Sequence, residues 1–289
     1  MTMNQMRFGE IDKPVEELAK EGLSILMEAK DLYKPVKTYV LTSGGNDSTT
    51  LMHLVRPYVD AAVHIRTGIG VPETSEFVRE ITAYFKLPLI ELVTPPEVYR
   101  DIVLGKTKKG FPGPNMHYIT YHRLKAERIR NLQRDYSKRG ERLLLVSGVR
   151  SQESERRMLG VGKFEHQAPT STATRCAWVN PLIHWTSYEM SSYRMAFQVP
   201  RSPVADKLHR SGECLCGTFA RPDELKEIEF WYPETANYIK SIQAEALAMG
   251  KKFPYWGHRA GKIPKTAGPL CSDCLFNMEE YEGVSDDAD

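Results

Sequence analysis

Along the N-terminal part of the chain, short apolar runs alternate with longer segments in which apolar residues recur every three or four positions. The short runs cover residues 39–42, 61–66 and 87–93 and include β-branched side chains, which is typical of strands. Helical spacing follows the first two runs: it begins after residue 48, with Leu51, Met52, Leu54 and Val55, and covers residues 72–85 after the second run. Because strands that alternate with helices at this distance form right-handed βαβ units, the pattern predicts a parallel sheet with flanking helices.

The remaining segments fit the same α/β pattern. An amphipathic helix is expected over residues 12–30, a long basic helix over 117–138 and further helix over 223–250. Residues 142–149 form a nearly continuous apolar run, as a strand buried on both faces requires. We therefore divide the chain into an N-terminal helix (1–35), a nucleotide-binding α/β domain (36–210), a cysteine-bearing helical extension (211–278) and an acidic tail (279–289).

A glycine turn separates the first strand from the first helix of the pattern. The sequence SGGNDS occupies residues 43–48, and its glycines allow a tight bend and a close approach to a ligand. The free N–H groups of the helix start can then hold an anion, with the hydroxyls of Ser43 and Ser48 as further donors. The turn thus predicts a phosphate site, and the alternative is a capped turn with Asp47 or Ser48 in the first helical turn. No Lys-Ser or Lys-Thr follows the glycines, so this is not a Walker loop.

Two short-spaced cysteine pairs form a second candidate site. Cys214 and Cys216 make one pair, and Cys271 and Cys274 make the other. Pairs that lie far apart in sequence can supply two corners each of a tetrathiolate site, for zinc or for a [4Fe–4S] cluster. Spacing alone cannot choose the metal, and unpaired thiols are a third alternative.

Composition and charge narrow the class of protein. Apolar and charged fractions of 41% and 26% are those of a soluble globular protein, and no apolar run approaches the length of a membrane span. Five cysteines are too few and too oddly counted for a disulfide scaffold, and no apolar signal core opens the chain, so we expect a cytoplasmic protein. The net charge is +2, yet eleven basic residues lie between Lys106 and Arg142. They form either a solvated helix face and loop or a surface for a polyanion.

Several motifs, in order, resemble one superfamily. SGGNDS resembles the SGGxDS loop of the ATP pyrophosphatases, which are PP-loop enzymes of the adenine nucleotide alpha hydrolase type. HIRTGIGVPETSEFV, residues 64–78, resembles the second-strand motif of the PAPS (3′-phosphoadenylylsulfate) reductase superfamily, with Arg66 where the family has Asp. GVRSQESERR (148–157) and WVNPLIHW (178–185) resemble its later motifs, so the resemblance spans roughly residues 37–221.

The resemblance implies a fold and a set of site residues. The fold is a Rossmann-like, five-stranded parallel sheet flanked by helices, with the cysteine-bearing helical extension after it. Ser43, Asp47, Ser48 and Arg150 would be catalytic, and Arg150 suits phosphate because its guanidinium is a planar donor. The nucleotide would be bound by Ser43, Gly44, Gly45, Asn46, Asp47, Ser48, Thr67, Gly68, Arg150, Glu153 and Arg156. Similarity to cluster-bearing relatives such as the DNA-phosphorothioation ATPase favours a [4Fe–4S] cluster over zinc on Cys214, Cys216, Cys271 and Cys274, although Cys-x-Cys differs from the usual Cys-x-x-Cys.

Three functions follow from these readings. The first is an enzyme that binds ATP with Mg²⁺, cleaves it between the α and β phosphates and serves sulfur transfer, with a nucleic-acid acceptor on Lys106–Arg142 and a sulfur-donor protein as candidate partners. The second is a PAPS or adenylylsulfate reductase, or an ATP sulfurylase-like activity. No cysteine follows Cys274, which counts against the reductases. The third is a non-catalytic, zinc-stabilised nucleotide-binding subunit, and an oligomer is compatible with all three.

Overall fold

The computed structural model describes residues 13–151, 164–169 and 175–258. Within these ranges the chain forms one sheet with the strand order β3-β2-β1-β4-β6-β5. Five parallel strands make up most of it: β1 (Lys37–Thr42), β2 (Ala61–Arg66), β3 (Leu89–Val93), β4 (Leu143–Val146) and β6 (Cys176–Val179). The predicted parallel sheet is confirmed.

The strand count differs from the prediction. A sixth strand, β5 (His166–Gln167), pairs antiparallel with β6 at the edge of the sheet. A strand of 2 residues is too short for an alternating pattern of apolar and polar positions, so no periodicity announced it.

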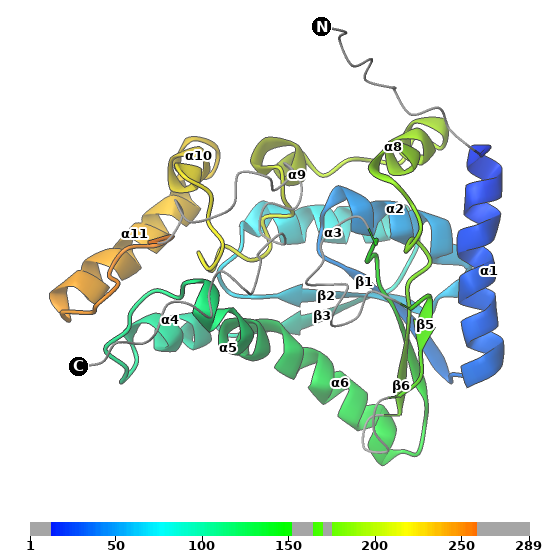
Figure 1. Ribbon diagram of the computed structural model, residues 1–289, viewed down its shortest axis with the longest axis horizontal. Coiled ribbons are helices and arrows are strands. Elements are labelled where there is room, and N and C mark those ends of the chain that lie inside the picture. Colours follow the sequence, from blue (N-terminus) through cyan, green and yellow to red (C-terminus); the bar gives the residue numbers. More distant parts are fainter. Residues whose placement is uncertain (1–12, 152–163, 170–174, 259–289) are drawn as a thin grey trace, which may run out of the picture.

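Helices cover both faces of the sheet (Figure 1). One face packs against side chains from four helices: α1 (Val15–Tyr33), α2 (Asn46–Val55), α3 (Pro72–Tyr84) and α8 (Ser187–Ala196). The other face packs against α6 (Glu127–Lys138) through Ile129 and Leu132. Strands β1 and β4 contribute to both cores, and this burial on two sides explains their continuous apolar runs.

The predicted basic helix is divided into three parts. It consists of α5 (His117–Tyr121), a π-helical segment η3 (His122–Ala126) and α6. It follows α4 (Pro96–Leu104), a loop and the short turn η2 (Pro114–Met116).

The segment after residue 202 adds a further layer at one side of the sheet. It contains α9 (Pro203–Leu208), α10 (Glu224–Trp231) and α11 (Pro233–Ala248), and in Figure 1 these lie on the side where α4 and α5 are drawn. A separate apolar cluster joins them to α4 and to the loop after β2. The predicted division of the chain at residue 210 stays a prediction. No described helix is both long and apolar enough to cross a bilayer.

Candidate functional site

The glycine turn lies at the carboxyl end of β1 and leads directly into α2. Gly44 has φ +74°, and a Cβ at this position would lie 2.6 Å from Thr74 Cγ2 on α3. Both observations require glycine here. Gly45 is the extended residue that precedes the first turn of α2, so the free N–H groups of that turn point out of the carboxyl edge of the sheet.

Hydroxyl groups surround this turn. Ser48 Oγ donates to Gly45 O at 2.9 Å and lies 3.3 Å from Ser43 Oγ. The N–H groups of Ser43, Gly44 and Gly45 make long bonds of 3.3–3.4 Å to the side chains of Ser48, Thr42 and Ser43. Bonds of this length are weak, so the oxygens of a phosphate can compete for these donors.

Asp47 joins two arginines beside the turn. Its Oδ2 accepts from Arg150 Nε at 3.2 Å and Nη2 at 2.9 Å, and its Oδ1 accepts from Arg194 Nη1 at 3.3 Å. The side chain of Arg150 is only 3% exposed and that of Arg194 11%, whereas Asp47 is 26% exposed. Two guanidinium groups and one carboxylate leave this site with a positive balance at the start of a helix, which favours an anion.

Arg194 is a candidate site residue that sequence reasoning missed. Burial lowers the pKa of its guanidinium, and the nearby Asp47 carboxylate opposes only part of this effect. It lies on α8, whose start is fixed by a capping box between Thr186 and Glu189. On the same helix, Ser187 contacts Arg150 and Ser191 contacts Arg194. No local pattern marked Arg194, because it lies 147 positions after Asp47 and meets it only in the folded chain.

The side chain of Asn46 is occupied by the protein itself. Its Oδ1 accepts from Ser202 N at 2.8 Å, and its Nδ2 donates to Asp206 Oδ1 at 3.0 Å. It therefore ties the start of α2 to α9. Its predicted contact with a nucleotide stays a prediction.

Thr67 and Gly68 lie at the carboxyl end of β2, beside the turn that carries the first cysteine pair. Thr67 N donates to Glu213 Oε1 at 2.8 Å, and Thr67 Oγ1 donates to Glu213 O at 2.5 Å. Gly68, with φ +74°, lets the chain turn against Thr94 O. Arg66, the residue before them, is exposed.

A buried histidine completes this connection. His64 Nδ1 donates to Thr42 O at 3.0 Å, and its Nε2 lies 3.0 Å from Glu213 Oε2. The end of β1, which opens the glycine turn, is thereby linked through β2 to the residue before Cys214.

The Cys-x-Cys turn is held by several buried contacts. Leu215 O accepts from Trp256 Nε1 at 2.7 Å, Cys216 O accepts from Tyr99 Oη at 2.9 Å and Cys214 O accepts from Arg210 Nη2 at 2.9 Å. A hydrogen bond from Cys216 lowers the pKa of the Cys214 thiol to about 6, against the effect of burial, and raises that of Cys216. The thiolate is the form that binds metals, so this pair fits two corners of a thiolate site.

Four predicted site residues fall outside the described residues: Glu153, Arg156, Cys271 and Cys274. Within the described ranges, no group of three or more His, Cys, Asp or Glu side chains is placed to hold a metal ion. The four-cysteine site stays a prediction.

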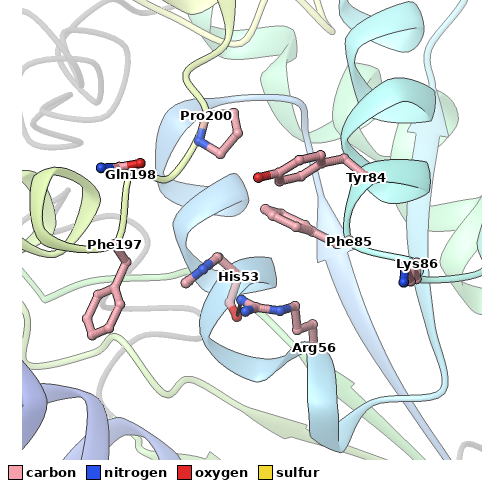
Figure 2. Close-up of a pocket in the computed structure, with 8 residues that line it drawn as sticks. All are labelled: His53, Arg56, Tyr84, Phe85, Lys86, Phe197, Gln198 and Pro200. Carbon is pink, nitrogen blue, oxygen red and sulfur yellow. Dashed lines mark hydrogen bonds between the residues drawn. The ribbon is translucent and has the colours of Figure 1, made fainter.

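A pocket of about 380 Å³ lies elsewhere (Figure 2). Its lining comes from the last turns of α2 and α3 and from the residues after α8: His53, Arg56, Tyr84, Phe85, Lys86, Phe197, Gln198 and Pro200. Because α2 starts at the glycine turn and ends here, this pocket is at the opposite edge of the sheet. Ligands of open parallel sheets bind beyond the carboxyl ends of the strands, so we do not assign the nucleotide to it.

The sheet and the SGGNDS turn at its carboxyl edge define a class, the PP-loop proteins of the adenine nucleotide alpha hydrolase type. A match to a family model identifies the family within this class. The model described as "Phosphoadenosine phosphosulfate reductase domain" matches residues 37–218, and the chain belongs to this family. The resemblance found in the motifs is confirmed over nearly the range expected.

Three solved structures illustrate the likeness. Phosphoadenylyl-sulfate (PAPS) reductase from Candida auris, in a phosphate complex, is 17% identical, with 68% of this chain and 94% of that chain covered and a TM-score of 0.45. NMN synthetase from Francisella tularensis is 16% identical, with 87% of this chain and 96% of that chain covered and a TM-score of 0.49. FMN adenylyltransferase from Candida glabrata in complex with ATP is 16% identical, with 69% of this chain and 62% of that chain covered and a TM-score of 0.47. Sequence identities this low do not identify the substrate of this protein. No curated protein matches the sequence significantly.

Proposed function

We propose that this protein is an ATP-using enzyme that cleaves the nucleotide between its α and β phosphates, transfers the adenylate to an acceptor and releases pyrophosphate. The observation that carries the proposal is the turn from Ser43 to Ser48, with Asp47 held between Arg150 and Arg194. The turn offers N–H and hydroxyl donors, and the arginines offer cationic ones. This combination suits a leaving pyrophosphate, on which negative charge accumulates during the reaction.

Each group has a distinct role in this proposal. Pyrophosphate oxygens would rest on the N–H groups of Ser43 to Gly45 and on the hydroxyls of Ser43 and Ser48. Arg150, fixed by Asp47 and by the carbonyl of Trp185 at 3.4 Å, would bind the phosphates from one side. Asp47 is the partly exposed carboxylate at the turn, and it would hold Mg²⁺, which neutralises phosphate charge.

The first cysteine pair connects the proposal to sulfur chemistry. Cys214 and Cys216 lie on the turn whose Glu213 bonds the end of β2, close to the same edge of the sheet. With Cys271 and Cys274 they would hold a [4Fe–4S] cluster, which holds or delivers sulfur when it is bound; zinc is the alternative occupant. The sulfur donor would be a separate protein.

The test measures nucleotide binding and pyrophosphate formation separately. We expect the purified protein to bind ATP in calorimetry, and to release pyrophosphate with Mg²⁺ while the AMP moiety is transferred to the acceptor, when single-stranded RNA, single-stranded DNA or sulfate is added. Ser48→Ala should reduce turnover, whereas Ser241→Ala on α11 should not. Absence of ATP binding, or of pyrophosphate with every acceptor, would contradict the proposal.

The family match favours a second candidate, reduction of an adenylylated sulfate. The same preparation therefore receives PAPS or adenylylsulfate with a thiol reductant. Release of sulfite without use of ATP would favour the reductase.

A further inference from the structure

Aromatic rings gather on the exposed side of α5 and the start of η3. Tyr118 is 69% exposed and Tyr121 is 49% exposed. Each lies against a histidine one turn away: the rings of His117 and Tyr121 stack with centroids 6.1 Å apart, and those of Tyr118 and His122 are 6.2 Å apart. Two exposed tyrosine rings and two partly buried histidine rings therefore lie within two helical turns.

The π-helical segment sets the position of these rings. η3 interrupts the helix directly after Tyr121, and its backbone is fixed from below because Thr94 Oγ1 donates to Leu124 O at 2.7 Å. Arg123 on η3 forms an ion pair of 2.7 Å with Asp101 on α4, and this pair also holds η3 in place. An interruption of this kind is uncommon within helices and frequently marks a functional site.

The charge around the rings is positive and available. Lys106, Lys108 and Lys109 are exposed on the loop before α5, Lys125 lies on η3, and none of the four has an ion pair within the described ranges. Further along the helix the charges are more often engaged: Arg128 with Glu127 and Arg139 with Glu141. Lysines without an ion pair thus lie on the loop that leads into α5 and on η3, the segments that flank the two tyrosines in sequence.

The same surface adjoins the thiol turn. The ring of His117 lies 4.9 Å from that of Phe219, which follows Cys216 by three residues. Figure 1 shows α5 below the segment that joins α9 to α10, which carries this turn. A molecule bound on α5 would thus extend towards the candidate cluster site and the carboxyl edge of the sheet.

We propose that α5, η3 and the loop of residues 105–113 bind single-stranded nucleic acid. Bases would stack on Tyr118 and Tyr121, and the phosphates would contact Lys106, Lys108, Lys109 and Lys125. Every base offers a π face, so exposed rings beside unpaired cations suit an unpaired strand. In a duplex the base faces are covered by their neighbours, so the rings would have no partner. Binding of the strand does not require adenylation, so this part of the inference is independent of the proposed function. Only the role of the strand as the acceptor of the adenylate rests on the proposed function.

The test uses the full-length protein and fluorescence anisotropy with labelled oligothymidylate and oligouridylate of about 12 nucleotides. Tyr118→Ala and Tyr121→Ala should each weaken binding about tenfold, whereas Tyr118→Phe should retain it, because phenylalanine also stacks. Tyr84→Ala is the matched control, since Tyr84 is 70% exposed on α3 and lies at the distant pocket. Lys108→Gln combined with Lys109→Gln should reduce the dependence of affinity on salt.

Three results would overturn the inference: no binding of either strand at low salt, a duplex bound as tightly as a single strand, or equal losses in Tyr118→Ala and Tyr84→Ala. Binding of a polyglutamate peptide with the same sensitivity to Tyr118→Ala would assign the surface to an acidic protein instead. ATP binding is measured on the same preparations. A wild-type protein that binds ATP but neither strand contradicts this inference alone, whereas a wild-type protein that binds a strand but not ATP contradicts the proposed function alone.

Discussion

His64 Nε2 lies 3.0 Å from Glu213 Oε2, and the side chains are 0% and 5% exposed. This contact joins β2 to the turn that carries Cys214. Without this carboxylate the buried N–H of Thr67 would lose its acceptor and His64 Nε2 would lose one of its two partners, and unsatisfied buried polar groups are destabilising. We therefore expect Glu213→Ala to lower the free energy of unfolding by about 3 kcal/mol, measured by urea denaturation. Glu245→Ala, which breaks the exposed pair with Arg100, should cost less than about 1 kcal/mol. Equal costs for the two variants would argue against this role of the buried pair.

Gly44 allows a direct test of the glycine turn. Gly44→Ala combines φ +74° with a Cβ only 2.6 Å from Thr74 Cγ2, so we expect it to destabilise the protein by about 2 kcal/mol and to abolish ATP binding. Two controls separate the causes. Gly140→Ala has φ +73° but nothing within 4 Å, and Gly148→Ala would make only ordinary contacts of 3.6 Å or longer. If Gly148→Ala lost ATP binding as fully as Gly44→Ala, the close approach to α3 would not be the reason.

Arg150 should be irreplaceable by lysine. Two of its nitrogens reach the same Asp47 oxygen, and Nη1 also lies 3.3 Å from Ser187 Oγ. A lysine ammonium cannot reproduce this planar fork. We expect both Arg150→Lys and Arg150→Gln to weaken ATP binding at least about tenfold in calorimetry, with Arg100→Gln unchanged. Full affinity in Arg150→Lys would show that charge alone is sufficient.

His53 should make stability depend on pH. Burial, and then the charge of Arg56, lowers the pKa of its imidazole from 6.5 to about 4. Between these values the unfolded chain binds a proton that the folded protein excludes, so the contribution is complete above pH 6.5 and is lost as the pH falls towards 4. Allowing for partial exposure, we expect a loss of about 1–2 kcal/mol. Urea unfolding of the wild type and of His53→Gln at about pH 5 and pH 7 checks this. Identical pH dependence in both proteins would exclude His53 as the source.

The cysteines should differ in their effect on bound metal. After anaerobic purification we expect iron and a broad visible absorbance, both lost in Cys214→Ala and in Cys271→Ala. Cys176→Ala is the control, because burial raises the pKa of the Cys176 thiol to about 12 and keeps it protonated. If the protein contains zinc and has no visible absorbance, the site holds a structural zinc ion and not a cluster. If all variants contain the same amount of metal, these cysteines do not form a metal site.

The sequence predicted those parts of the fold that are determined by residues close together in the chain. The turn from Ser43 to Ser48, with a strand before it and a helix after it, follows from neighbouring residues, and so do the apolar runs of the parallel strands. Arg194 could not be found in this way, because only the packing of α8 against α2 brings it to Asp47. Glu213 was overlooked for a similar reason: its partners, His64 and Thr67, lie on another strand end.

The bonds of Asn46 have a consequence for how the protein is made. Its side chain is bonded to Ser202 and Asp206, which follow it by 156 and 160 positions, and Thr67 is bonded to Glu213, 146 positions later. A ribosome releases the glycine turn long before these partners exist. The turn can therefore reach its final geometry only after most of the chain has been synthesised, so a nascent chain that stops before residue 202 should contain the loop without its anchor.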